Sequence, residues 1–203
     1  MNSYSVDAKS PRRLKDRFRE ETGEVVLAAA EQLFAQEGLH GASMAQIADR
    51  AGVAVGTLYN HFKDRETLLE ALLDRRRGEM LDSIDQQLAR LSKEPFARQL
   101  QGFLQVVFDY FEEHRAFLLI VFEHGSWKKC NETPRALYQR IEPLLRLGHR
   151  EKALRPDTHQ SFAVVLLGSV RATFLREKYG LAPLSAPDAV AAITDAFLRG
   201  AAR

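Results

Sequence analysis

Cysteine is nearly absent from the sequence, since Cys130 is the only one among 203 residues. A single thiol excludes a disulfide within the chain and any zinc or iron–sulfur site held by several cysteines. The histidines lack the i, i+4 pairing and the cysteine partners that are typical of zinc ligands on helices. We therefore predict neither a metal nor another cofactor.

Long apolar runs are also lacking. Residues 117–122 form one of the longest, whereas a helix needs about 20 apolar residues to span a membrane. The N-terminus has no apolar core after its first charged residues, so it does not read as a secretion signal. We expect no membrane segment, no export and a cytoplasmic location.

An excess of one charge is lacking too. The formal net charge is +2, and residues 1–63 hold eight basic and eight acidic side chains. Bulk charge therefore gives no support for nucleic-acid binding. The distribution is uneven, because residues 1–19 hold six basic and two acidic side chains. This segment is either an arm that follows DNA phosphates or a solvated, disordered tail.

Apolar residues recur at helical spacing along most of the chain, and no stretch alternates with period two. With 45% hydrophobic residues, the chain can form a sizeable core. Thr133 is expected to cap a helix with Pro134 at its first position, and Pro156 to interrupt the chain before the next. The spacing predicts an all-α fold. The first helix begins near residue 13 or 22 and ends at 36, and the others lie near residues 43–52, 54–62, 64–91, 95–115, 116–126, 133–147, 157–179 and 185–197.

Residues 43–62 have the layout of two short helices joined by a tight turn. Ser43 and Gln46 have capping-box spacing at the start of the first helix. Gly52 suits the positive φ that ends it. In the second helix we expect an inward-facing side formed by Val55, Leu58 and Phe62. The expected outward side is small and polar, with Gly56, Thr57 and Asn60 facing out and Tyr59 and His61 at its flanks.

These residues stand in a recognisable order. The chain reads A-E-Q-L-F at 30–34, followed by Gly38. It then reads I-A-D-R-A-G-V at 47–53 and G-T-L-Y-N-H-F at 56–62. The segment from about residue 24 to 73 resembles the N-terminal domain of the TetR family of transcriptional regulators. Two positions depart from that family's usual residues, because Ala54 removes a side-chain cap and Val55 replaces a basic or polar residue.

The resemblance implies an N-terminal three-helix helix-turn-helix domain followed by a larger helical domain that binds a ligand and dimerises. We expect a basic, disordered arm at 1–20, the DNA-binding domain at 21–65 and the effector-binding and dimerisation domain at 66–203. The implied function is a repressor that binds a palindromic operator as a homodimer through its last two helices. The implied DNA contacts are Ser43, Val55, Gly56, Thr57, Tyr59, Asn60, His61, Lys63 and Arg65.

Aromatic residues are numerous in the second half of the chain. They suit a pocket for an apolar or aromatic effector, although each one singly is as well explained as core. The candidate ligand-binding residues are Phe103, Phe108, Phe111, Phe122, Trp127, Tyr138, Phe162 and Phe174.

Two other classes of function are an enzyme and a helical interaction module. No glycine-rich phosphate loop, nucleophile elbow or metalloprotease motif occurs in the sequence, so nothing points to an enzyme. A helical interaction module that uses DNA only for localisation would share the same helix-turn-helix. Its DNA binding would be insensitive to sequence.

Overall fold

The computed structural model describes residues 11–123, 132–155, 160–182 and 184–201, and divides the chain into two compact units, one ending at Leu72 and one beginning at Leu73. Within these ranges there are nine α-helices, one 3₁₀ helix and no strand, which confirms the predicted all-α fold. None of the described helices is long and apolar enough to cross a membrane. The unit boundary lies inside a helix, a little beyond the boundary expected after residue 65.

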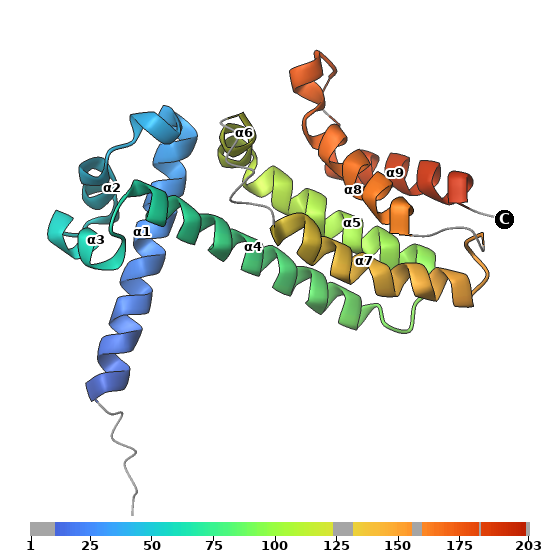
Figure 1. Ribbon diagram of the computed structural model, residues 1–203, viewed down its shortest axis with the longest axis horizontal. Coiled ribbons are helices and arrows are strands. Elements are labelled where there is room, and N and C mark those ends of the chain that lie inside the picture. The colour runs from blue at the N-terminus through green and yellow to red at the C-terminus, as the bar shows by residue number, and fades with distance from the viewer. Residues whose placement is uncertain (1–10, 124–131, 156–159, 183, 202–203) are drawn as a thin grey trace, which may run out of the picture. The chain divides into compact units, whose positions relative to one another are not determined.

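The first unit contains α1 (Pro11–Gly41), α2 (Met44–Ala51), α3 (Val55–His61) and the start of α4 (Arg65–Arg90) (Figure 1). Disorder was the wrong expectation for residues 11–20, which are helical, while residues 1–10 lie outside the described ranges. Arginine and glutamate favour helices, and the Arg17–Glu21 pair at 3.6 Å has i, i+4 spacing. Gly38 interrupts α1 at φ 79°, close to where the sequence predicted its end.

A small apolar core holds these helices together. The buried stripe of α1 faces α2, and both contribute side chains that are fully or almost fully buried. Burying such side chains removes apolar area from water at roughly 25 cal/mol per Å². The buried residues of this unit include Val26, Ala29, Ala30, Leu33, Phe34, Ile47, Ala48, Leu58 and Leu68.

The second unit is built around α5 (Phe96–Glu113), which contacts α6, α7, α8 and α9 (Figure 1). The surrounding elements are α6 (Arg115–Glu123), α7 (Glu132–Arg150), α8 (Gln160–Phe174), the 3₁₀ helix η2 (Arg176–Tyr179) and α9 (Ala186–Ala201). The apolar stripe predicted on α5 is its buried face, formed by Phe96, Leu100, Phe103, Leu104, Val107 and Phe108.

Two helix boundaries differ from the prediction. Helix α7 begins at Glu132, so Thr133 lies inside the first turn instead of capping it. Pro134 is tolerated there because the first N–H groups of a helix have no intrahelical partner. Helix α8 ends at Phe174, since Leu175 leaves helical geometry at ψ 5°, and η2 continues to Gly180 at φ 72°. The break predicted at Pro156 lies outside the described residues.

Candidate functional site

Helix α2 is fixed at both ends by its own neighbouring residues. The Ser43 hydroxyl oxygen accepts a hydrogen bond from the Gln46 N–H at 3.2 Å, and Gln46 Oε1 accepts one from the Ser43 N–H at 2.8 Å. Gly52 has the left-handed φ of 67° and donates its N–H to the Asp49 carbonyl at 3.0 Å. The predicted capping box and glycine end are therefore both present, and Ser43 sets where α2 begins.

Helix α3 follows after a short turn and is anchored by Leu58, which is fully buried, and by Phe62. Val55 was expected to face inward, but 43% of it is exposed. That expectation was wrong because Val55 is the first helical residue, and the buried side of α3 starts one turn later at Leu58.

The exposed side of α3, called here the recognition face, consists of Val55, Gly56, Tyr59 and Asn60. Tyr59 is 50% exposed, and a Cβ atom placed on Gly56 would meet nothing within 4 Å. Thr57 is half-buried at the edge of this face. A helix side with small groups, an amide and an amphipathic ring has the shape and hydrogen-bonding capacity to enter a major groove.

His61 lies against α1 instead of fully in solvent. It is half-buried, and a Cβ atom on Gly23 would approach its Nδ1 to 3.8 Å. Its ring centroid is 6.0 Å from that of Phe62. These contacts show that His61 packs on its neighbours, and its contact with DNA stays a prediction.

The two basic residues after α3 have different surroundings. Lys63 is exposed. Arg65 is half-buried, and its Nη1 donates to the His40 carbonyl at 3.0 Å. Arg65 therefore ties the start of α4 to the end of α1. The Asp64 carboxylate caps α4 by accepting from the Thr67 N–H at 2.7 Å.

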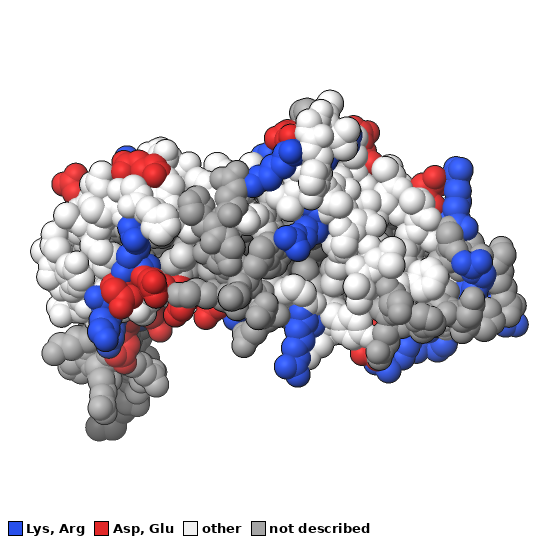
Figure 2. Space-filling view, turned by 45° about the horizontal axis from the view of Figure 1, so that its top comes forward, with Lys and Arg blue, Asp and Glu red and all other residues white. Residues whose placement is uncertain are grey.

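Charge is mixed on the face of the molecule that Figure 2 shows. On the side of the molecule that Figure 2 shows, Lys and Arg are interspersed with Asp and Glu and separated by uncharged areas. This agrees with the equal numbers of basic and acidic residues in positions 1–63. Any nucleic-acid affinity of the first unit must therefore come from individual contacts.

Ala54 provides a test of how firmly α3 is held. It is the N-cap residue of α3, has extended geometry and makes no side-chain cap. We expect Ala54→Ser to raise the free energy of unfolding by about 1 kcal/mol, measured by urea denaturation. Ala28→Ser makes the same change at an exposed position inside α1 and should lower stability by a few tenths of a kcal/mol. Equal effects of the two changes would contradict the capping argument.

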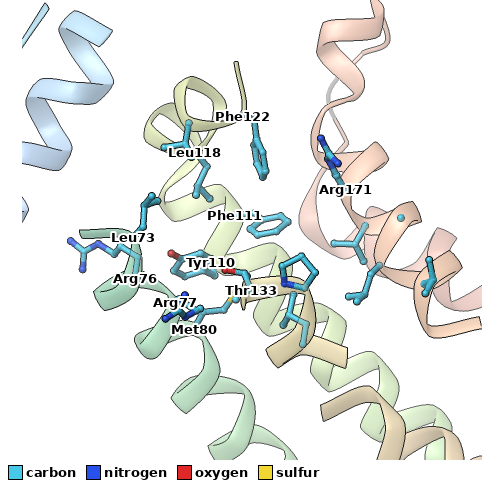
Figure 3. Close-up of a pocket in the computed structure, with 17 residues that line it drawn as sticks. Leu73, Arg76, Arg77, Met80, Tyr110, Phe111, Leu118, Phe122, Thr133 and Arg171 are labelled. Carbon is cyan, nitrogen blue, oxygen red and sulfur yellow. The ribbon is translucent and has the colours of Figure 1, made fainter. Parts of the chain in front are cut away.

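The second unit contains a cavity of about 450 Å³ (Figure 3). Its walls come from α4, α5, α6, α7 and α8, and most of its surface is apolar. This volume lies in the range of sites that enclose small organic molecules, about 300–1,000 Å³. The described lining residues are Leu73, Arg76, Arg77, Met80, Tyr110, Phe111, Leu118, Val121, Phe122, Thr133, Pro134, Leu137, Val164, Leu167, Gly168, Val170 and Arg171.

The aromatic residues predicted for this pocket divide into several groups. Phe111 and Phe122 line the cavity. Phe174 is buried next to both of them, with ring centroids 4.8 Å from Phe111 and 5.5 Å from Phe122. Among the remaining candidates that the structure describes, none lines the cavity: Phe103 and Phe108 are core, Tyr138 packs on that core, and Phe162 contacts Phe197. Trp127 lies outside the described residues.

The sequence reasoning missed the contribution of α4 and the polar lining residues. Leu73, Arg77 and Met80 follow one another at helical spacing, which is a usable sign that they share a side of α4. Nothing in that spacing shows that this side meets Tyr110 and Thr133. Among the described residues, no cluster of side chains could hold a metal ion.

Comparisons with known proteins agree with these features. A family model described as bacterial regulatory proteins of the tetR family matches residues 26–72. The HTH-type transcriptional activator FasR of Mycolicibacterium smegmatis is 31% identical over 106 residues, which cover 52% of this chain and 48% of FasR. The chain thus spans about half the length of that relative.

Solved structures share the fold over nearly the whole chain. The fatty acid degradation regulator FadR of Bacillus halodurans superposes with a TM-score of 0.75 at 20% identity, covering 87% of this chain and 98% of FadR. A transcriptional regulator from Saccharomonospora viridis in complex with choline has a TM-score of 0.76 at 18% identity, covering 91% of this chain and 99% of that one.

The matched family consists of regulatory proteins and FasR is named as a transcriptional activator, which agrees with the prediction that this chain is not an enzyme. The matched segment contains the capped α2, the exposed side of α3 and the start of α4. On these findings, residues 26–72 of the chain match the tetR family of bacterial regulatory proteins, in the segment where the sequence resemblance was found.

Proposed function

We propose that the protein regulates transcription by binding a palindromic DNA operator as a homodimer, and that a small ligand in the cavity of the second unit releases it. The observation that carries the proposal is the recognition face of α3. It is exposed on a helix whose other side is anchored by Leu58, so it can enter a groove without unfolding.

A dimer is needed because α3 has only seven residues. Two such helices held about 34–36 Å apart would read successive major grooves. Helices α8 and α9 supply a surface for the second copy. Val164 and Val165 of α8 are 65% and 61% exposed, and the exposed residues of α9 include Ala191, Ala192 and Ala196. Small side chains permit two helices to approach closely.

In this proposal, individual side chains of the first unit also contact the DNA. Tyr59 and Asn60 are placed to reach bases or phosphates, and Lys63 to reach a phosphate. The basic residues at 1–19 provide further phosphate contacts in this proposal.

Helix α4 connects the ligand to the DNA-binding unit. Leu68 and Leu72 in its first part are buried, whereas Leu73, Arg77 and Met80 further on line the cavity. A ligand that prefers one position of α4 therefore changes the population of DNA-competent molecules. The shift in this population is set by the difference in the ligand's binding free energy between the DNA-competent and the DNA-incompetent state.

The proposal is tested by selecting binding sites from random duplex DNA with the full-length protein. We expect a palindrome whose half-sites are about one helical turn apart, bound by a species that sediments as a dimer at micromolar concentration. Binding without sequence preference would instead favour a helical module that uses DNA for localisation. A monomer on the selected palindrome would contradict the two-fold arrangement.

A further inference from the structure

We propose that the cavity of the second unit takes an amphipathic organic anion, with an apolar body and a single carboxylate that binds near Arg77. The regulatory meaning of this ligand rests on the proposed function above, but the binding itself can be measured without DNA.

The first support is the charge of the lining. Its described residues include Arg76, Arg77 and Arg171 but no aspartate, glutamate or lysine, and the remainder are apolar apart from Tyr110 and Thr133. Charges interact more strongly beside an apolar, poorly hydrated wall than in water. Because arginines are the only charged side chains among its described lining residues, the cavity favours an anion.

The second support is the location of Arg77. Its side chain is 19% exposed, whereas that of its ion-pair partner Asp74 is 63% exposed, at a distance of 3.1 Å. Asp74 is thus the more exposed partner of this ion pair, and it is not itself among the described lining residues. A guanidinium has five N–H donors in a planar fork, so it can bind a ligand carboxylate in addition to Asp74.

Hydroxyl groups accompany this arginine. In Figure 3, Tyr110 and Thr133 are drawn toward the same end of the cavity as Arg77, and the guanidinium of Arg76 points away from it. Arg76 is instead paired with Glu79 at 2.6 Å. Hydroxyl and guanidinium donors together can bond both oxygens of one carboxylate.

The other end of the cavity is apolar and aromatic. Figure 3 shows Phe111, Leu118 and Phe122 there, with Arg171 across from Phe122. The Arg171 guanidinium carbon lies 5.9 Å from the Phe122 ring centroid, a cation–π distance. Arg171 therefore contacts an aromatic wall, while Arg77 lies with the hydroxyl groups that suit a carboxylate.

This lining argues against a cationic ligand. A quaternary ammonium ion such as choline would be placed beside arginines without a described carboxylate in the lining to balance it. Although one structure with the same fold contains choline, the ligand of this chain is expected to have the opposite charge.

Three probes of equal chain length separate these possibilities: dodecanoate, dodecanol and dodecyltrimethylammonium, each titrated calorimetrically into the full-length protein below its micelle concentration. We expect dodecanoate to bind at least about tenfold more tightly than dodecanol, because it adds a charge-assisted hydrogen bond. The ammonium probe is expected to bind most weakly. No binding of dodecanoate, or equal binding of acid and alcohol, would overturn the proposal.

Variants locate the carboxylate. Arg77→Gln should weaken dodecanoate binding about ten- to hundredfold and leave dodecanol unchanged. Arg75→Gln is the matched control, because Arg75 begins the same run of three arginines, pairs with Glu79 at 2.9 Å and is not among the described lining residues. A loss caused by Arg171→Gln and not by Arg77→Gln would overturn the assignment to Arg77.

Two further measurements distinguish a loss of ligand binding from a loss of folding, and a failure of the anion assignment from a failure of the proposed function. Should Arg77→Gln lower the unfolding temperature, Tyr110→Phe removes one hydroxyl donor from the same end and should weaken dodecanoate about three- to tenfold. Dodecanoate that binds but fails to release the selected operator would contradict the proposed function alone. Release by a ligand with equal affinity for the Arg77→Gln and wild-type proteins would contradict the anion assignment alone.

Discussion

A Val165→Asp protein is expected to sediment as a monomer and to bind its operator at least about a hundredfold more weakly than the wild type. Val165 is 61% exposed on α8 and does not line the cavity. In the proposed dimer two copies of this surface face each other, so each substitution buries a carboxylate without a partner. The monomer then offers one recognition face where the operator presents two half-sites.

Sedimentation and operator titration on the same sample check this prediction. Ala116→Asp is the control, because it adds the same charge at an exposed position of α6, outside α8 and α9. Its dimer and its operator affinity should be unchanged. A Val165→Asp protein that remains dimeric would show that a different surface joins the subunits.

The features predicted correctly from the sequence have causes within a few residues. The cap at Ser43 depends on Gln46 three positions later, and the ends of α2 and η2 depend on glycines that accept a positive φ. Such interactions form wherever the local chain is helical. They could therefore be predicted without knowing what packs around them.

The exposure of side chains at helix ends could not be predicted from the sequence, because it depends on how the helices pack against one another. Val55 and Leu58 are three residues apart, which on an ideal helix places them on similar sides. Only the structure shows that the core covers Leu58 and leaves Val55 exposed. Arg65 is similar, since its carbonyl partner at His40 is 25 residues earlier in the chain, and no spacing rule connects the two.

The cavity could be predicted even less well from the sequence, because it also depends on packing between helices. Phe103 and Phe111 both belong to the apolar pattern of α5, yet Phe103 is core and Phe111 lines the cavity. A periodic pattern identifies the side of a helix that avoids water, but not whether another side chain or an empty space lies opposite. Arg77 was missed for that reason, because the cavity walls other than α4 come from four other helices.

The second large effect is expected at the recognition face. Tyr59→Ala should weaken binding to the selected operator by about 30- to 1,000-fold. Tyr59 is 50% exposed and has both an apolar ring and a hydroxyl, and losing a side chain of this kind costs about 1–2 kcal/mol per contact. The loss is doubled because a dimer makes the contact in both half-sites.

Fluorescence anisotropy with the selected duplex, at several salt concentrations, measures this effect. Because Tyr59 is exposed, the free energy of unfolding should change by no more than about 0.5 kcal/mol. Lys63→Ala provides the contrast, since losing one phosphate contact per subunit should reduce the slope of log K against log salt by about 2. Tyr59→Ala should leave that slope nearly unchanged, because it removes no charge. Unaltered operator affinity in Tyr59→Ala would mean that DNA is read by a surface other than the exposed side of α3.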